Sequence, residues 1–271
     1  MDCNLKFGLK LYSTNTDLIK DASKLHEDGL FYYVELYIIP GSFEKTIDSW
    51  KAFEVPFVIH APHSIHGINL ARADMLEDNQ RNFHEAQRFT DSLGAEIIIV
   101  HGGNNGSFDE TIRQIALLGE ERIALENKPK MGLHGEICVG YSPSDFHRAK
   151  REGVLYGTVL DFGHAACAAR SLEIDVMEIV REFMAFEPKI FHLVDGESSS
   201  ERDTHLNLGK GNLNIVDFIS VIPNESMVTI ETPRDSSKGL HDFINDIYFL
   251  RKMIHQRSQG FQKLERVYGR D

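Results

Sequence analysis

Residues 191–214 contain side chains that could bind a metal ion: two histidines and the carboxylate of Asp203. His192 lies near the end of a short apolar run that predicts a buried strand, and Asp203 and His205 lie in the polar loop that follows. Imidazole nitrogens and carboxylate oxygens both bind zinc and the neighbouring transition metals. The loop therefore predicts a metal site, with an ordinary polar surface loop as the alternative.

Other histidines and carboxylates stand at the ends of further apolar runs. His60, His101, Glu126, Asp161 and Glu231 each close, or nearly close, a run that predicts a strand. Taken singly, a histidine at such a position is more often hydrogen-bonded than metal-bound, and a carboxylate often caps the next helix. Their recurrence along one chain favours a shared site.

Together with His164, three residues after Asp161, these residues make nine potential metal ligands. One zinc ion takes four ligands, of which one is often water, so convergence of all nine predicts two or three ions. The candidate metal ligands are His60, His101, Glu126, Asp161, His164, His192, Asp203, His205 and Glu231.

The hydrophobic pattern predicts an α/β fold that would bring these residues together. Eight short apolar runs of strand type alternate with longer stretches of helical period. The predicted strands are Leu5–Tyr12, Phe31–Ile39, Val55–His60, Glu96–His101, Arg122–Asn127, Gly157–Phe162, Lys189–Val194 and Met227–Thr232. Eight strand–helix units in about this length predict a single parallel (β/α)8, or TIM, barrel, in which the carboxyl ends of the strands meet at one face.

Apolar residues at helical spacing predict the covering helices, and one further helix is expected near residues 43–53. Each of three predicted helices has one apolar face, made by Leu76, Phe83, Ala86 and Leu93, by Leu172, Val176, Ile179 and Phe183, and by Leu240, Phe243, Ile244 and Ile247. Residues 128–143 predict a long loop. We expect one domain over residues 1–271 that ends in a polar tail from about residue 255.

Composition narrows the class of protein. The 271 residues carry a net charge of −12, which argues against broad attraction to nucleic acid or to an anionic membrane, although a metal site can still bind a phosphate. Three cysteines at unrelated spacings predict neither a disulfide framework nor a CxxC zinc site. The sequence shows no export signal and no apolar stretch of membrane-spanning length, so we expect a cytoplasmic protein without a membrane partner.

Four residues are candidates for substrate binding: Lys10, Glu35, His63 and Lys210. Lys10 lies near the end of the first predicted strand, where it could neutralise a substrate anion. Glu35 lies within an apolar strand, where an anchoring hydrogen bond is the alternative to substrate binding. His63 follows the third strand, and a position without substrate contact is the alternative. Lys210 lies in a Gly-Lys-Gly turn that lacks the spacing of a phosphate-binding P-loop.

The motifs of this chain resemble those of the xylose isomerase-like TIM barrels, a superfamily that includes endonuclease IV and many sugar isomerases and epimerases. The resemblance covers nearly the whole chain, through GLKLYS, VIHAPH, IIIVHGG, IALENKP, TVLDFGHA, FHLVDG, DTHLNLGKGN and VTIETP. Resemblance to endonuclease IV implies a three-zinc cluster held by the nine residues above. Resemblance to the sugar enzymes implies a single divalent ion held by Glu126, Asp161, His192 and Glu231, with the two glutamates passing a proton at the sugar carbon.

The chain also departs from the endonuclease IV pattern. Those enzymes usually begin with Gly-Ala-His-Val-Ser, carry a Gln/Arg-rich loop after the second strand and a Tyr after the third, and read Asp-Thr-Cys-His at the sixth. Here these stretches are GLKLYS, YIIPGSF, His63 and DFGH, and only Arg72 and Lys210 are evident basic candidates near the mouth. The parts that would open a duplex are therefore not evident.

We therefore expect a divalent-metal enzyme with one to three ions, zinc or manganese being preferred. The first hypothesis is isomerisation or epimerisation of a small sugar or sugar phosphate, with Glu126 and Glu231 as the acid/base pair and His164 as a further catalytic candidate. The alternative is an endonuclease IV-like hydrolase of abasic DNA or of a small phosphoester, nucleic acid being the less favoured partner. A third hypothesis is a binding protein that has kept the ligands. The sequence leaves the substrate, the metal and the oligomeric state open.

Overall fold

The computed structural model describes residues 4–233 and 239–268, and the strands within them form one closed parallel barrel. Strands adjacent in sequence pair with each other, and the last strand closes the barrel by pairing with the first, with Leu9 opposite Ile230. The strands are β1 (Lys6–Tyr12), β2 (Tyr33–Tyr37), β3 (Phe57–His60), β4 (Ile98–His101), β5 (Ile123–Glu126), β6 (Gly157–Asp161), β7 (Ile190–Leu193) and β8 (Met227–Ile230). The predicted (β/α)8 barrel is confirmed, with strands slightly shorter than predicted.

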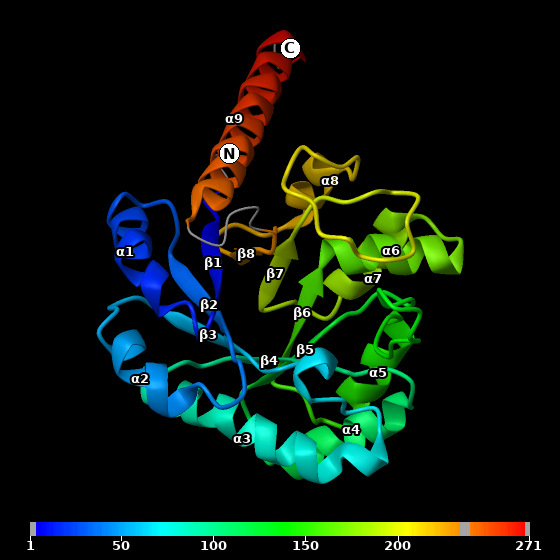
Figure 1. Cartoon of the computed structure of the whole chain (residues 1–271). Coiled ribbons are helices and arrows are strands. Elements are labelled where there is room, and N and C mark those ends of the chain that lie inside the picture. Colours follow the sequence, from blue (N-terminus) through cyan, green and yellow to red (C-terminus); the bar gives the residue numbers. More distant parts are fainter. Residues whose placement is uncertain (1–3, 234–238, 269–271) are drawn as a thin grey trace.

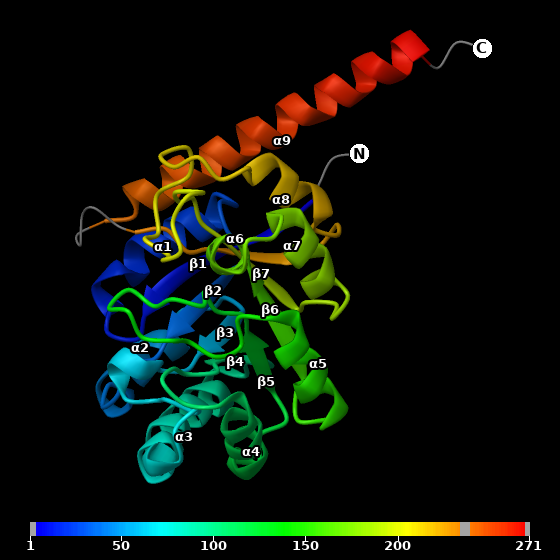
Figure 2. The same cartoon turned by 90° about the vertical axis from the view of Figure 1, so that its right-hand side faces the viewer.

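Helices surround the barrel (Figure 1). They are α1 (Ile19–Glu27), α2 (Phe43–Lys51), α3 (Leu76–Leu93), α4 (Phe108–Leu118), α5 (Pro143–Arg151), α6 (Phe162–Leu172), α7 (Val176–Met184), α8 (Ile215–Val221) and α9 (His241–Tyr268), with 3-10 turns η1 (Thr16–Leu18), η2 (Ser64–His66) and η3 (Ala73–Met75). The first part of α9 lies beside α1 and α8, and its later part extends beyond the barrel (Figure 2). None of the helices in the described ranges is long and apolar enough to cross a membrane.

One sequence-based expectation needs correction. The apolar face that we assigned to one helix over residues 172–183 belongs to two, because Glu173 adopts a left-handed conformation (φ 56°) that ends α6. The Asp175 side chain then accepts hydrogen bonds from the backbone N–H groups of Met177 and Glu178 and so starts α7. In addition, residues 255–268 of the expected polar tail continue α9, and the remainder of that tail lies outside the described residues.

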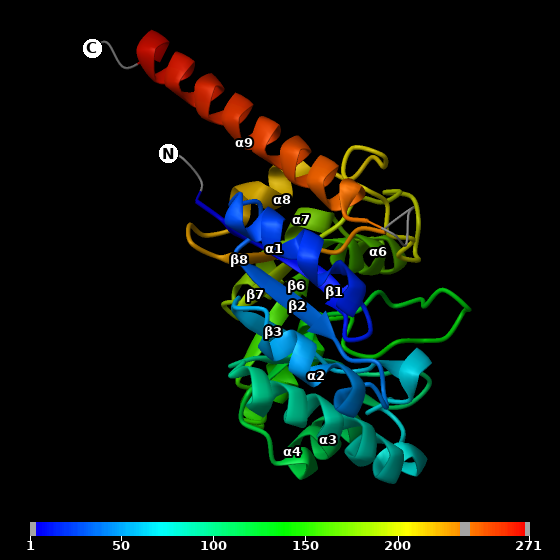
Figure 3. The ribbon, with the colours of Figure 1, turned by 60° about the vertical axis from the view of Figure 1, so that its left-hand side comes forward.

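Alternation along the strands places the candidate ligands inside the barrel mouth. Residues such as Val58, Ala124 and Ile190 form an apolar layer in the barrel interior, whereas their neighbours in sequence pack outward against the helices. Because side chains alternate between the two faces of a strand, the residue two positions further on points inward again, one layer nearer the carboxyl ends. These next residues are His60, Glu126 and His192. The loops after β5 and β7 lie on this same side of the barrel (Figure 3).

Tyr33 fills the barrel interior opposite Gly8, and its hydroxyl forms a 2.7 Å hydrogen bond with Thr229 Oγ1. A Cβ atom at position 8 would overlap the Tyr33 ring. We therefore expect Gly8→Ala to lower the free energy of unfolding by about 1–3 kcal/mol, measured by urea denaturation. In a Tyr33→Leu background the same substitution should cost less, because the overlapping ring is gone. An equal cost in both backgrounds would contradict this packing.

Candidate metal centre

The nine predicted ligands meet at the carboxyl ends of the strands, where they form three groups, two of which share Glu126. Within each group, one ligand atom from every residue lies within 4.8 Å of those from the others. The groups are His60, His101 and Glu126; Glu126, Asp161, His192 and Glu231; and His164, Asp203 and His205. Because Glu126 belongs to two groups, its carboxylate lies where a bridging ligand between two ions would lie.

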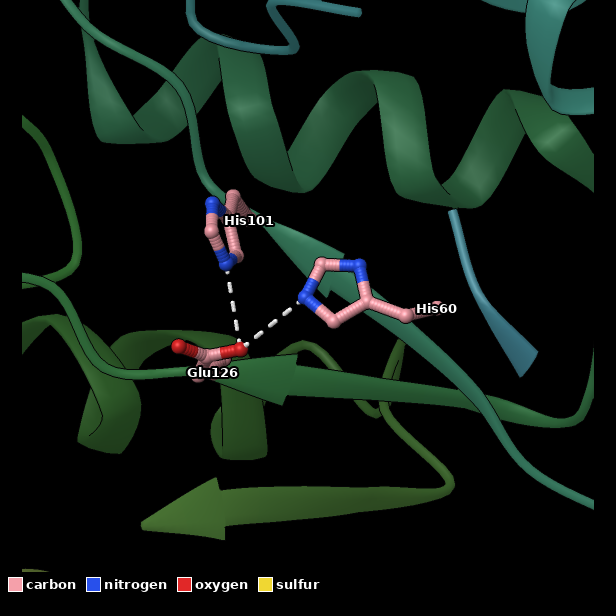
Figure 4. Close-up of side chains that lie close together, drawn as sticks. All are labelled: His60, His101 and Glu126. Carbon is pink, nitrogen blue, oxygen red and sulfur yellow. Dashed lines mark hydrogen bonds and ion pairs between the residues drawn. The ribbon is translucent and has the colours of Figure 1, made fainter. Parts of the chain in front are cut away.

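The Glu126 carboxylate is fully buried, and the imidazoles of His60 and His101 point toward it (Figure 4). Its Oε2 lies 3.1 Å from His101 Nε2, 3.4 Å from His60 Nε2 and 3.6 Å from His192 Nδ1. Its Oε1 lies 3.0 Å from His164 Nδ1. Burial opposes ionisation of this carboxyl group, but the neighbouring His101 and His192 hold its pKa well below the usual range.

Three of these imidazoles are oriented by a hydrogen bond from one ring nitrogen. His60 Nδ1 lies 2.8 Å from a backbone carbonyl, and His164 Nδ1 lies 2.8 Å from the carbonyl of Asn127. His192 Nε2 lies 2.8 Å from Glu35 Oε2. A backbone carbonyl can only accept, so the contacts of His60 and His164 assign a proton to Nδ1 and leave Nε2 of each ring with a lone pair. Metal-binding histidines are oriented in the same way. His192 lies between two carboxylates, since its Nδ1 is 2.7 Å from Glu231 Oε2; burial lowers its pKa, but these carboxylates raise the pKa well above the usual value.

The donor atoms of this centre fit a divalent metal. Buried polar atoms in proteins are normally hydrogen-bonded, yet several atoms here have no hydrogen-bond partner within the described part of the chain. These atoms are His60 Nε2, Glu126 Oε1, Asp161 Oδ2 and Asp203 Oδ2. Imidazole nitrogen with carboxylate oxygen is a donor set that zinc and manganese accept.

The centre also gathers negative charge. Burial, opposed by nearby His164, combines with the charges of Asp203 and Glu231 to raise the pKa of Asp161 to about 6. For His205, burial lowers the pKa, but Asp203 and Glu231 outweigh it and raise the pKa to about 9. Both shifts express the same excess of carboxylates, which bound cations would offset.

Glu35, a predicted substrate-binding residue, is fully buried behind His192. It also accepts a 2.6 Å hydrogen bond from Thr229 Oγ1, and its other oxygen lies 3.0 Å from Lys10 Nζ. Burial would raise the pKa of Glu35, but His192 and Lys10 lower it to about 2. This location matches the anchoring alternative, because the carboxylate holds a candidate ligand from behind.

A cavity of about 190 Å³ opens over the centre. Its floor includes His101, His164, Asp203, His205 and Glu231, and its walls come from the loops after β3 and β5. Ile65, Met131 and Leu133 contribute apolar surface to these walls. Glu126 is not among the lining residues, so its carboxylate is enclosed beneath the imidazoles.

The other predicted substrate-binding residues lie in three different settings. His63 lines the cavity, and its ring stacks on that of His101 with centroids 5.1 Å apart and planes 8° apart. Lys10 does not line the cavity, because its Nζ lies 2.6 Å from Glu231 Oε1 and close to Glu35. Lys210 is exposed in its turn and also lies outside the cavity lining. Of these, His63 alone is placed to touch a ligand in the cavity.

Sequence reasoning did not single out Lys128 or Asp195. Lys128 lines the cavity, and its Nζ lies 3.2 Å from His164 Nε2. Asp195 is buried below the loop that carries Asp203 and His205. Both residues stand inside quoted motifs, IALENKP and FHLVDG, but nothing in residue type or spacing distinguished them from ordinary loop positions.

The Asp195 carboxylate gathers the backbone of the loop after β7. Its Oδ2 accepts from the N–H groups of Gly209 at 2.9 Å and Gly211 at 3.0 Å, and its Oδ1 accepts from Leu213 at 3.2 Å. Its own backbone pairs with that of Leu206, next to His205. A Cβ at position 211 would overlap this carboxylate and the neighbouring backbone, so glycine is required there.

Comparisons with known proteins agree with this fold. A family model described as "Xylose isomerase-like TIM barrel" matches residues 35–253. The structure is similar to that of a D-tagatose 3-epimerase-like protein (TM-score 0.70, 19% identity, 94% of this chain and 99% of the other). It is also similar to endonuclease IV from Thermus thermophilus (TM-score 0.68, 19% identity, 93% of this chain and 99% of the other). A third similar structure is that of another protein of that organism, from a crystal soaked in zinc chloride (TM-score 0.61, 20% identity, 91% of this chain and 98% of the other). At these identities the likeness shows the fold alone.

The substitution Asp195→Asn should loosen the loop that carries two candidate ligands. An amide nitrogen in place of Oδ2 cannot accept hydrogen bonds from the N–H groups of Gly209 and Gly211. We therefore expect faster exchange of the backbone amide hydrogens over residues 206–213. Zinc affinity should fall by about 10–100-fold, as when partners that orient metal ligands are lost. Asp217→Asn, which changes a cap contact at the exposed start of α8, is the matched control. Unchanged exchange in Asp195→Asn would contradict this role.

Proposed function

This chain belongs to the family of xylose isomerase-like TIM barrels, and within it we propose a divalent-metal-dependent hydrolase that cleaves small phosphoesters. The observation that carries the proposal is the enclosure of Glu126. In the sugar hypothesis this carboxylate must reach a substrate carbon, yet it is fully buried, contacts four imidazoles and does not line the cavity. A carboxylate in this position suits a bridge between ions rather than a proton shuttle to substrate.

The nine ligands divide into sets that would hold more than one ion. His60 and His101 with Glu126 would hold one, and the groups containing His192 and His164 would hold the others. Zinc and manganese are the ions that we propose. When bound, such ions supply the Lewis acidity that phosphoester hydrolysis needs.

Glu231 is the candidate general base. It lines the cavity, and the ammonium of Lys10 lies 2.6 Å from its Oε1. Burial opposes its ionisation, but Lys10 and His192 hold its pKa well below the usual range, so the carboxylate stays ionised. From this position it can orient a water molecule and accept its proton.

The shape and charge of the mouth favour a small substrate over duplex DNA. The cavity, at about 190 Å³, is smaller than typical sites for drug-sized ligands, which run from about 300 Å³ upward. Ile65 and Leu133 are exposed at its rim, Arg72 is paired with Asp74, and Lys210 lies apart. A protein that holds duplex DNA needs basic side chains along the backbone path, and this rim offers few.

Isomerisation or epimerisation of a small sugar is the second candidate. Two observations favour it: the group Glu126, Asp161, His192 and Glu231 could hold a single ion, and the structure is similar to a D-tagatose 3-epimerase-like protein. In this function Glu231 could act from the cavity, but Glu126 would have to become accessible first.

Hydrolysis of bis(p-nitrophenyl) phosphate and p-nitrophenyl phosphate tests the proposal. We expect zinc- or manganese-dependent release of p-nitrophenol that a chelator abolishes. His60→Ala and His101→Ala should lower kcat/KM by at least about 100-fold, as much as Glu126→Gln does, because all three belong to one ligand group. His84→Ala, on the exposed face of α3, is the control and should leave kcat/KM unchanged.

The opposite pattern would support the sugar function. In that case His60→Ala and His101→Ala would retain activity, while Glu126→Gln and Glu231→Gln would abolish exchange of a sugar C–H proton with solvent.

A further inference from the structure

Lys128 is the one Lys or Arg among the residues that line the cavity above the centre. Hydrogen bonds hold the backbone at this position: the N–H of Lys128 donates to Gly140 O at 3.0 Å, and the side chain of the preceding Asn127 pairs with the backbone of Asp161. The backbone of Lys128 is therefore held at the edge of the centre, and its side chain extends to His164.

The ammonium of Lys128 lies 3.2 Å from Nε2 of His164. Nδ1 of this imidazole donates to the Asn127 carbonyl, so Nε2 carries the lone pair and accepts from the ammonium, which can only donate. His164 belongs to the ligand group with Asp203 and His205, and its Nε2 lies 3.4 Å from Asp203 Oδ2. One lone pair cannot serve an ammonium and a metal ion together.

Occupation of this group by a metal ion would therefore release Lys128. Within the described ranges Nζ makes no other hydrogen bond or ion pair, and the released ammonium would lie beside a second positive charge. The cavity that it lines is the space open to it, and an anionic oxygen there would satisfy both charges. Lys10 differs, because the carboxylates of Glu35 and Glu231 already hold it.

We propose that Lys128 is the anion-binding residue of this site and that it couples metal binding to the binding of a phosphoryl group. It competes with the metal for His164 Nε2, and a phosphoryl oxygen in the cavity removes that competition by binding the ammonium instead. Metal and phosphate then bind cooperatively, and each raises the affinity for the other by the same factor. The inference rests on the proposed function and narrows its substrates to phosphoesters with a free anionic oxygen in the cavity.

Zinc titration against a chromophoric chelator, with and without inorganic phosphate, tests the coupling without any turnover. For the unmodified protein we expect phosphate to tighten the binding of one zinc ion by about tenfold, within the usual range of couplings between sites. Lys128→Met should bind that ion several-fold more tightly without phosphate and should lose most of the phosphate effect. Lys128→Arg should keep part of the effect because it keeps the charge. Lys130→Met, in the same loop and outside the cavity lining, should behave like the unmodified protein.

A phosphate effect that is equal in Lys128→Met and the unmodified protein would overturn the inference, with circular dichroism showing that both are folded. Failure of the proposed function looks different: the coupling would be present, but no phosphoester would be cleaved. Conversely, metal-dependent cleavage with an unaltered phosphate effect in Lys128→Met would overturn the role of Lys128 alone. Absence of zinc binding by the unmodified protein would overturn both.

Discussion

The gathering of five carboxylates at one end of the barrel, four of them buried, is the constraint on which the rest of this structure depends. Glu35, Glu126 and Asp161 are fully buried, Asp203 is nearly so, and Glu231 is partly exposed to the cavity. A buried charge costs several kcal/mol unless it is paired and hydrogen-bonded. Lys10 contacts two of these carboxylates, and imidazoles surround the others. The centre thus consists of candidate metal-ligand atoms whose combined negative charge bound cations would offset.

Side chains outside the set of candidate ligands support this arrangement by binding the backbone of the loops around the centre. Asp195 gathers the loop after β7, and Asn127 joins the ends of β5 and β6. The loop after β3 is held by buried amides, since Asn79 accepts from Asn69 N–H and donates to Gln114. Hydrogen bonds made by residues outside the set of candidate ligands therefore help to determine where the cavity walls lie.

Much of the fold, and the grouping of the candidate ligands at one end of the barrel, could be predicted from local sequence pattern. Strand period alone places His60, Glu126 and His192 on the inward phase, two residues beyond apolar core positions, and eight such strands close into a barrel. The split between α6 and α7 did not follow, because one left-handed residue, Glu173, interrupts an apolar spacing that continues across it.

The reach of individual side chains could not be predicted from the sequence. Glutamate and lysine often bind substrates, yet in this barrel the side chain of Glu35 contacts His192 and that of Lys10 contacts Glu231. Lys128 follows a strand by two residues, and its contact with His164 depends on where the loop after β5 meets the start of α6. Enclosure of Glu126 likewise arises from imidazoles on four other elements of the fold. Such contacts join residues distant in sequence, where local pattern carries no information.

The metal content of protein purified without added metal, measured by elemental analysis together with an anomalous diffraction map, tests the central claim most directly. The account predicts more than one ion per chain, with density between His60, His101 and Glu126 and again beside His164, Asp203 and His205. A single ion held by Glu126, Asp161, His192 and Glu231, with no density at the other two groups, would contradict it.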